Sequence, residues 1–499
     1  MDDRTRRNEL AQAPAEPPRI SLYKHGSLRR RCNTAAACAG LPGTACAIFA
    51  KPQGGSAGAF TLPVFRRGRS ARRWAPRNGL RDFRKPRDGS AGAFTPPPAS
   101  SSDTAGESAR DFHSAFGLRS SSFLNPVLHL VPRTHPVIDG IGDYALNLAR
   151  HVRTQSGIGA SFLIGDPAWE GPEQHDGFGL KKLPARTAGD LTAALAASGT
   201  MSLVVHYVTY GYHPRGVPVW FRDGLDHWLA GQREQPRVIT VFHELWSSGP
   251  PWRSEFYFGW MQRRLVRRML RVSGRAVTST LRMKRLLDAV RPGVTDLLPI
   301  SSNFPLDSSP PTRTPSAAGL RLILFGQTAQ RLHSARAHLP LIRSLQQAGR
   351  LAVLHVVGKG AAEGTAVSED VAFLRSAAPE VALRIAGNVA LEEAVARFRG
   401  SDLFLSFYPA SLACKSTALM SALACGCAAV LPDDADSAPL VVGQHFLSCD
   451  GSPASVDRLL AALDHGGSER IGQAAAAWYR QNADWPIIAR RFAKLLGQP

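Results

Sequence analysis

Short apolar strands alternate with helical segments in two successive rounds, and this alternation constrains the fold more than any other feature of the chain. Short, wholly apolar strands between helices are typical of parallel sheets that are covered on both faces. The sequence therefore predicts an α/β protein with two doubly wound, Rossmann-like domains. The expected strands are residues 127–132, 160–166, 202–208, 237–244 and 275–280 in the first round and 320–326, 351–358, 381–387, 402–408 and 428–432 in the second.

A Pro- and Ser-rich segment, residues 296–319, separates the two rounds and is expected to contain the domain boundary. We expect an N-terminal Rossmann-like domain at 123–305, a linker at 306–319 and a C-terminal Rossmann-like domain at 320–482. Residues 483–499 are predicted to form a C-terminal amphipathic helix whose apolar face needs a neighbour.

The first 122 residues differ from the rest of the chain and are rich in Arg, Gly, Ala, Pro and Ser. They contain a near-duplicate, KPQGGSAGAFTLP at 51–63 and KPRDGSAGAFTPP at 85–97, which is too few copies for a solenoid. We predict a low-complexity, disordered basic segment, or a mis-annotated extension upstream of the true start. The alternative is a basic arm that binds nucleic acid or lipid headgroups.

The net charge of +21 is unevenly distributed, because residues 1–120 hold 21 basic and only 9 acidic residues. The remaining chain is mildly basic, as expected for a protein that handles anionic substrates. We therefore predict no specific nucleic-acid partner.

The cysteines indicate a reducing compartment, and the apolar runs are too short to indicate a membrane span. The seven cysteines have no metal-ligand spacing, and Cys425 and Cys427 are too close together for a zinc knuckle, so we predict no metal site. No run approaches the roughly 18–20 apolar residues that span a bilayer. We expect a cytoplasmic protein, and peripheral contact with the inner (cytoplasmic) membrane remains open.

The loop after the first expected strand, PVIDGIGDYA, is a candidate ligand-binding loop. Gly140 and Gly142 allow a tight turn and a close approach of the backbone to a ligand, while Asp143 and Tyr144 open the following helix. The alternative is a simple glycine turn in which Asp143 caps the helix. The pattern is not a complete GxGxxG and does not indicate a dinucleotide site.

Histidines end two further strands of the same expected sheet. His243 and Glu244 end the strand RVITVF and form a candidate general-base or substrate-orienting pair. His206 ends the neighbouring strand and could line the same wall. A structural role for these histidines is the alternative.

In the second expected sheet, residues at the strand ends are candidates for binding a nucleotide-linked donor. Gly326 and Asn388 could meet it through the backbone, whereas Arg331 and Lys359 could reach a diphosphate; solvated surface side chains are the alternative. The segment SDLFLSFYPASLACKSTALMSALACGCAAVLPDD (401–434) adds a strand, a loop and a helix.

Lys415, Ser416 and Thr417 lie where that loop enters the helix expected at 415–425. A cation, two hydroxyls and free helix N–H groups together suit a phosphate. This group is the strongest candidate site in the sequence.

Residues 125–497 resemble the GT-B glycosyltransferases, and most closely the family-4 type. The motifs that carry the resemblance are DGIGDYALNLA, VFHELWSSGPPWRSEF and the segment at 401–434. The resemblance implies two Rossmann-like domains facing across a cleft, with the acceptor on the N-terminal domain and the nucleotide-sugar donor on the C-terminal domain. It also implies catalysis without a bound metal or cofactor, in which positive groups neutralise the diphosphate leaving group.

The chain departs from the family-4 signature, which has two glutamates eight positions apart. Registered on Gly426, these positions hold Ala413 and Ser421. In the family the first glutamate lies by the donor sugar and the second holds the ribose. Ser421 can still donate a hydrogen bond to a ribose hydroxyl, whereas Ala413 offers nothing to a sugar.

We therefore expect a hexosyltransferase-like glycosyltransferase of polysaccharide biosynthesis, acting on a cell-envelope, glycan or lipid-linked acceptor. The alternatives are a GT-B-like protein that binds a nucleotide or glycan without transfer, and a nucleotide-sugar epimerase. The sequence does not identify the sugar, the nucleotide, the acceptor or the stereochemical outcome.

Overall fold

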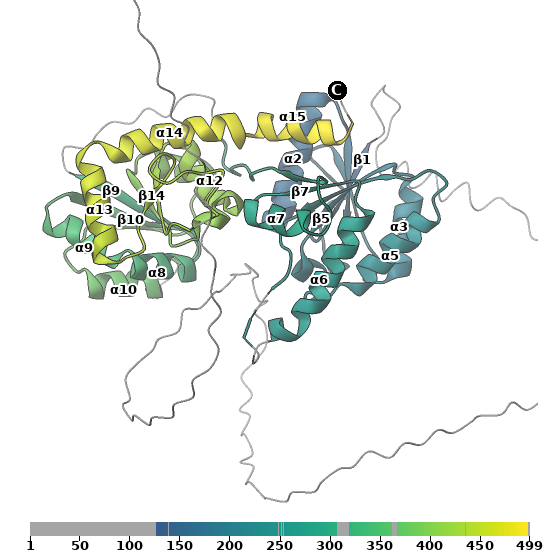
Figure 1. Ribbon diagram of the computed structural model, residues 1–499, viewed down its shortest axis with the longest axis horizontal. Helices are drawn as coiled ribbons and strands as arrows, with labels where there is room; N and C mark the ends of the chain where they lie inside the picture. Colours follow the sequence, from purple (N-terminus) through teal and green to yellow (C-terminus); the bar gives the residue numbers. More distant parts are fainter. Residues whose placement is uncertain are drawn as a thin grey trace, which may run out of the picture. The chain divides into compact units, whose positions relative to one another are not determined.

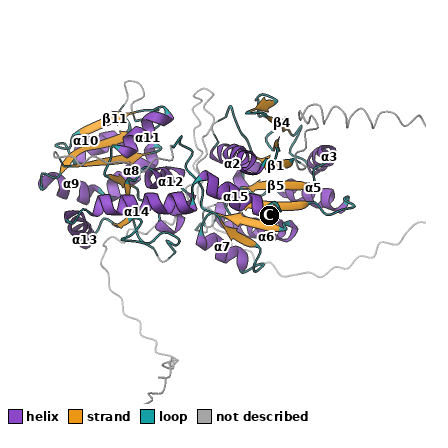
Figure 2. Ribbon diagram, turned by 90° about the horizontal axis from the view of Figure 1, so that it is seen from above, coloured by secondary structure: helices purple, strands orange, loops and turns teal. Residues whose placement is uncertain are grey.

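The computed structural model describes residues 126–497, except 138, 248, 251, 253, 307–318, 362–366 and 435. The predictions for residues 1–122 and for most of the linker at 306–319 lie outside the described residues. The described part contains two α/β units, each with its own sheet and with helices on both sheet faces (Figures 1 and 2).

The N-terminal sheet has eight strands in the order β3-β4-β2-β1-β5-β6-β7-β8, and every neighbouring pair is parallel except β3 with β4. One face packs against α3, α5, α6 and α7, and the other against α2. The strands are β1 (Val127–Val131), β2 (Ala160–Ile164), β3 (Gln174–His175), β4 (Phe178–Lys182), β5 (Ser202–Tyr207), β6 (Arg237–Phe242), β7 (Arg275–Thr278) and β8 (Thr295–Leu297). The helices are α2 (Gly140–Ser156), α3 (Ala188–Ser198), α4 (Thr209–Tyr212), α5 (Val219–Ala230), α6 (Ser254–Val272) and α7 (Leu281–Asp288).

The C-terminal sheet has six strands in the order β11-β10-β9-β12-β13-β14, all paired in parallel. Its strands are β9 (Leu320–Phe325), β10 (Leu351–Val357), β11 (Leu383–Ala386), β12 (Leu403–Leu405), β13 (Ala428–Leu431) and β14 (Leu447–Ser448). The flanking helices are α8 (Thr328–Ala337), α9 (Leu339–Gln347), α10 (Glu369–Ala377), α11 (Leu391–Arg399), the 3₁₀ turn η1 (Ala410–Lys415), α12 (Thr417–Ala424), α13 (Pro453–Asp464) and α14 (Gly467–Asn482).

The last helix, α15 (Trp485–Leu495), packs against α2 rather than against the C-terminal sheet (Figure 1). Its apolar side chains Ile488 and Phe492 share a core cluster with Val127 and Leu148. The neighbour that the amphipathic pattern of residues 485–497 required is therefore the first α/β unit.

The elements depart from the sequence prediction in a few places. Between β9 and β10 the chain forms two helices, α8 and α9, rather than one, because Pro340 lies in the first turn of α9 and cannot continue the helix before it. The helix expected at 415–425 begins at Thr417, and Lys415 belongs to the preceding 3₁₀ turn. The strands β3, β4, β8 and β14 are not among those expected from the sequence.

The first turn of α2 lies so close to the loop after β1 that one position accepts only glycine. A Cβ on Gly142 would clash with the carbonyl oxygen of Arg133 and lie 2.8 Å from Cα of Thr134. Both neighbours are backbone atoms that cannot move aside. A Cβ on Gly140, two residues earlier, would meet nothing within 4 Å.

We expect Gly142→Ala to lower the free energy of unfolding by about 1–3 kcal/mol, because it overpacks a backbone contact. The matched control, Gly140→Ala, should change it by less than about 0.5 kcal/mol. Urea denaturation of both variants measures the difference. Equal effects would show that α2 does not lie against this loop.

Candidate functional site

The crossover points of the two sheets identify where a ligand would bind. In a parallel sheet the strand order reverses direction at one point, and the loops after the two strands diverge there and leave room for a ligand. In the N-terminal sheet this point lies between β1 and β5, and in the C-terminal sheet between β9 and β12. The predicted site residues follow these strands or their neighbours.

The loop after β1 leads directly into α2. Asp139 caps this helix, and its side chain accepts hydrogen bonds from the backbone N–H groups of Ile141 (3.0 Å) and Gly142 (3.1 Å). The alternative in which Asp143 is the cap is therefore wrong. Burial and the Asp139 carboxylate raise the pKa of Asp143 to about 6. Gly140 is exposed and Gly142 is buried against the backbone.

His243 lies at the end of a row of three imidazoles. His129 Nδ1 is 3.0 Å from His206 Nε2, and His206 Nδ1 is 3.1 Å from His243 Nε2. His129 and His206 are buried, and Tyr144, also buried, meets the rings of His206 and His243 edge-on. Because His206 is enclosed, it cannot touch an acceptor directly, contrary to its predicted place on the acceptor wall.

The surroundings of the row favour neutral rings. Burial, and then the ammonium group of Lys415, lower the pKa of His243 to about 3. Burial alone lowers the pKa of His129 to about 3, and burial and the two neighbouring rings hold that of His206 well below its usual value. At neutral pH His243 can therefore accept a hydrogen bond or a proton through a free lone pair.

His129 was not identified from the sequence, although a signal was present. It is the one polar residue of the apolar strand VLHLV, and a polar side chain inside a strand that is buried on both faces needs a partner. The partner, His206, lies 77 positions further along the chain.

In the C-terminal sheet, Gly326, Lys359 and Asn388 follow the adjacent strands β9, β10 and β11, so the structure brings them to one edge. Lys359 and Asn388 are exposed there. Gly326 donates its N–H to the carbonyl of Val357 (3.1 Å), which ties the first two loops together.

Arg331 is a correction to the predicted site. Its side chain is fully buried and pairs with the equally buried Asp370, with Nε 2.7 Å from Oδ2. Nη1 donates to the carbonyl oxygens of Gly326 and Lys359. The guanidinium is therefore not available to a diphosphate, and it instead holds the two strand-end loops in place.

Lys415, Ser416 and Thr417 lie together after β12, beside the crossover point. The Ser416 hydroxyl caps α12 by accepting from Leu419 N–H (3.3 Å), and all three residues are partly exposed. Lys415 Nζ lies 3.3 Å from Glu244 Oε1, so the structure brings the strongest donor-site cation next to the predicted catalytic pair.

Ser421 does not face a ligand. Its hydroxyl is fully buried, donates to the Thr417 carbonyl (2.8 Å) and lies 2.6 Å from Ser302 Oγ. A hydrogen bond from Ser421 to a ribose, as predicted, would require this pairing to break. Ala413 is also fully buried.

The described cysteines and acidic groups show no cluster for an ion. Within the described part of residues 126–497, no group of three or more His, Cys, Asp or Glu side chains could hold a metal. The four cysteines there, Cys414, Cys425, Cys427 and Cys449, are buried and form no disulfide bond with one another.

Two parallel-sheet domains in tandem, with a last helix that returns to the first domain, define the GT-B fold of glycosyltransferases. The structure is similar to the apo form of the lipopolysaccharide outer core galactosyltransferase WaaB, with a TM-score of 0.50, 10% identity and coverage of 74% of this chain and 99% of that one.

Two further solved structures give lower scores. A glycosyltransferase from Rickettsia africae has a TM-score of 0.49 at 11% identity, covering 76% of this chain and 100% of that one. Anabaena HepE in complex with UDP-glucose has a TM-score of 0.48 at 13% identity, covering 75% and 100%. The sequence matches no protein-family model and no curated protein.

We expect Arg331→Ala to lower the free energy of unfolding by about 3–5 kcal/mol, because it leaves the Asp370 carboxylate buried without a partner. The matched control, exposed Arg336→Ala, should cost about 0.5 kcal/mol or less. The double variant Arg331→Met/Asp370→Leu should recover part of the loss, since it removes both charges. Chemical denaturation measures all three, and a double variant no better than Arg331→Ala would contradict the account.

Proposed function

We propose that the protein is a glycosyltransferase that transfers a sugar, most simply a hexose, from a nucleotide-diphosphate sugar to a glycan or lipid-linked acceptor of the cell envelope. The observation that carries the proposal is the position of Lys415 and the start of α12 after β12, beside the crossover point of the C-terminal sheet. The GT-B fold supports it, as does the galactosyltransferase activity in the name of WaaB.

The main chemical requirement of the transfer is stabilisation of the diphosphate leaving group. When the bond between the sugar and the diphosphate breaks, negative charge develops on the diphosphate oxygens and must be neutralised. We assign this to the Lys415 ammonium, the Thr417 hydroxyl and the free N–H groups at the start of α12, with Lys359 assisting from the next loop but one. In this mechanism, no bound metal or cofactor is required.

The family-4 resemblance supports only part of the proposed donor site. The positions of the two signature glutamates hold Ala413 and Ser421, and both side chains are buried. Contacts to the donor sugar must therefore come from other residues. Asn388, which is exposed at the end of β11, is our candidate for contact with the base or the ribose. His243 and Glu244 are our candidates on the acceptor side, with Gly140 and Asp143 lining the neighbouring loop.

We expect Lys415→Ala to weaken binding of UDP or GDP at least tenfold, because it removes the cation nearest the proposed diphosphate. Glu244→Gln should tighten binding several-fold, since Glu244 competes with the phosphate for Lys415. Isothermal titration measures both. The matched control is Lys284→Ala, which removes a lysine that is also held by a carboxylate, Asp288, but lies on α7. Unchanged affinity in Lys415→Ala would refute the phosphate assignment.

Two other activities remain to be separated from transfer. A protein that only binds a nucleotide or glycan would show the same titration without consuming the donor. An epimerase would convert one nucleotide sugar into another without releasing the nucleotide. Chromatography of UDP- and GDP-sugars after incubation distinguishes the three, because transfer or donor hydrolysis releases free UDP or GDP.

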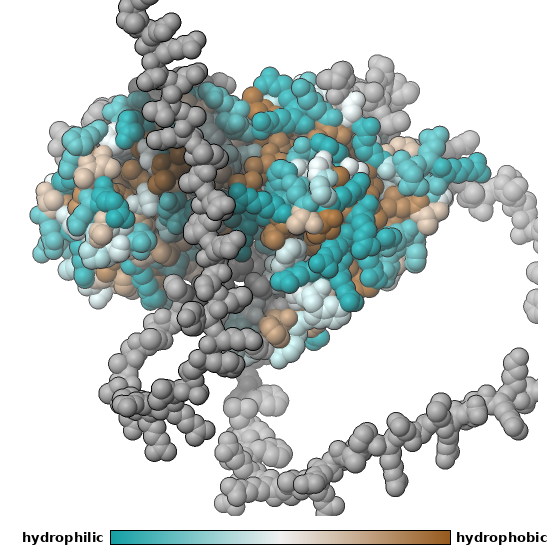
Figure 3. Space-filling model, viewed as in Figure 1, coloured by the Kyte–Doolittle hydropathy of each residue, from teal (hydrophilic) through white to brown (hydrophobic). Residues whose placement is uncertain are grey.

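The exposed face of α6 supports a peripheral membrane location. Phe256, Tyr257 and Trp260 are 52%, 61% and 53% exposed, and Trp252 just before the helix is 82% exposed. Arg263, Arg264 and Arg267 continue the exposed face along the helix. In the space-filling view, hydrophilic surface adjoins near-neutral and hydrophobic surface in this region (Figure 3).

Aromatic rings beside arginines suit the boundary of an anionic bilayer, where the rings enter the headgroup region and the guanidinium groups meet lipid phosphates. We propose that this α6 face contacts the membrane. No helix in the described part of the chain is long and apolar enough to cross a bilayer, so the contact we propose lies on the surface.

We expect the protein to float with vesicles that contain anionic lipid and not with purely zwitterionic vesicles, and to be released by high salt. Phe256→Ser/Trp260→Ser should lose flotation. The matched control, Val367→Ser/Leu391→Ser, removes two equally exposed apolar side chains elsewhere and should float normally. Equal loss in both variants, or flotation that does not depend on anionic lipid, would contradict the assignment. Binding to duplex DNA with the same salt dependence would instead favour nucleic acid.

A further inference from the structure

The three histidines form a diagonal across one face of the N-terminal sheet. His129 lies opposite Val204 of β5, two positions before His206, and His206 lies opposite Val241 of β6, two positions before His243. Each step to the next strand therefore advances two residues toward the carboxyl edge. Because side chains alternate between the faces of a sheet, this spacing keeps all three rings on the same side.

The rings are oriented for hydrogen bonding along the row. Adjacent rings are inclined by only 23° and 20°, with centroids 5.3 and 5.4 Å apart, so each nitrogen points approximately at the next ring in its own plane. Each contact joins Nδ1 of one ring to Nε2 of the next. Neutral imidazole has one N–H and one lone pair. The two hydrogen bonds can therefore form together only if all three rings share the same tautomer.

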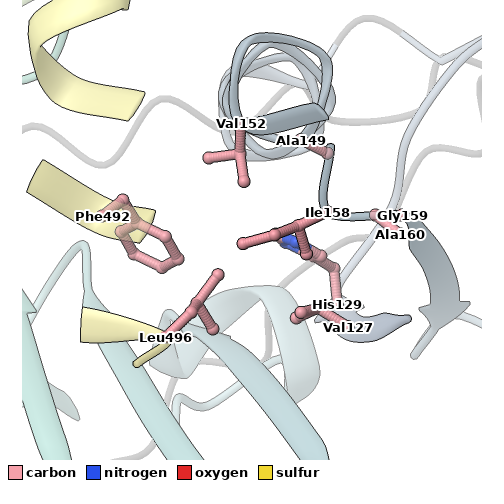
Figure 4. A pocket seen from close by; sticks show the side chains of 9 residues that line it. All are labelled: Val127, His129, Ala149, Val152, Ile158, Gly159, Ala160, Phe492 and Leu496. Carbon is pink, nitrogen blue, oxygen red and sulfur yellow. The ribbon is translucent and has the colours of Figure 1, made fainter. Parts of the chain in front are cut away.

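At the end of the row formed by His129, the side chains leave a small cavity. The imidazole of His129 points into a space of about 10 Å³ between β1, α2 and α15, which is also lined by Val152, Gly159 and Phe492 (Figure 4). That volume is near the minimum for one water molecule, and His129 is the one side chain of the lining with a polar group, so a water that enters from solvent has this imidazole as its partner. Gly159 is only partly buried, as is Leu496 on the far wall, so the cavity lies close to the protein surface.

The outer end of the row is His243, whose Nε2 is used by His206 and whose Nδ1 remains for a substrate. The charged groups near this end are Lys415 and Glu244, and the side chain that packs on the row from α2 is Tyr144. Lys415 opposes a lasting positive charge on His243. A proton that His243 accepts must therefore move on.

We propose that His129, His206 and His243 form a proton relay that carries the proton of the acceptor hydroxyl from the site to the cavity at the inner end of the sheet face. The relay rests on the proposed glycosyl transfer. His243 is the catalytic residue of the three, and His206 and His129 act through it.

The acceptor oxygen forms a bond to the anomeric carbon, and the bond between that carbon and the diphosphate oxygen breaks with its electron pair on the diphosphate. The acceptor proton moves to His243 Nδ1. In concert, the Nε2 proton of His243 moves to His206 Nδ1, that of His206 moves to His129 Nδ1, and that of His129 moves to a water molecule that enters the cavity from solvent and carries the proton away as hydronium. The row ends neutral, with all three tautomers reversed.

The first test needs no substrate. In ¹⁵N-histidine-labelled full-length protein at neutral pH, long-range ¹H–¹⁵N correlation spectra report the protonated nitrogen of each ring. We expect all three rings to be neutral and to share one tautomer, and His129→Asn to shift the His243 nitrogens. The exposed control His227→Phe should leave them unchanged. Mixed tautomers, or a charged ring in the row, would overturn the relay.

The second test measures release of UDP from UDP-glucose, with water as the acceptor. His129→Asn keeps a hydrogen-bonding group near the Nδ1 position but has no second nitrogen to pass a proton. We expect it and His129→Phe to lower kcat about tenfold or more with an unchanged KM. Full activity in His129→Asn with loss only in His129→Phe would show that the residue merely positions His206.

The two proposals fail in different ways. If wild-type protein turns over none of the UDP- or GDP-sugars tested, the proposed function fails, and the tautomers alone decide whether the row is continuous. If wild-type protein is active and both His129 variants match it, the relay is refuted while glycosyl transfer stands.

Discussion

Parallel strand pairing is the constraint on which the rest of this structure depends. It places the carboxyl ends of β1, β5 and β6 at one edge of the first sheet, and those of β9, β10 and β12 at one edge of the second. Residues that are tens to hundreds of positions apart in sequence become neighbours as a result. The row of histidines exists because three parallel strands each contribute one residue to the same face. The donor-site candidates converge on the second sheet for the same reason.

Burial then decides which polar residues serve the scaffold and which can meet a ligand. A charged side chain inside the protein must find a partner, since leaving its solvation uncompensated costs several kcal/mol. Arg331 finds Asp370 and two loop carbonyls, and so becomes a support for the loops of Gly326 and Lys359. Lys415, by contrast, remains partly exposed. The proposed site thus combines two accessible cations, Lys415 and Lys359, with a buried one that fixes the loops.

The sequence predicted the architecture well because alternating short strands and helices leave few possible folds. The expected strands were correct to within a few residues, whereas β3, β4, β8 and β14 were not predicted. The break between α8 and α9 follows from a local rule, since Pro340 cannot continue a helix. The short strand β4, with the sequence FGLKK, has too few apolar residues to be recognised as a strand.

Site prediction from the sequence was weaker, because a strand end only places a residue near an edge. Lys415, Ser416 and Thr417 do lie together after β12, while Arg331 and Ser421 turned inward. Whether a side chain points out or in depends on partners from other elements, such as Asp370 on α10 and Ser302 in the segment after β8. No spacing within one segment reveals such partners.

By itself, the sequence determined the two doubly wound domains, their order and the segments that line their strand ends, because hydrophobic periodicity is a local property of the chain. Only the tertiary structure decided that Arg331 is a buried support, that Asp139 rather than Asp143 caps α2, and that His129, His206 and His243 form one hydrogen-bonded row. These outcomes depend on distances between residues far apart in sequence. Packing sets those distances, and strand pairing determines which residues meet.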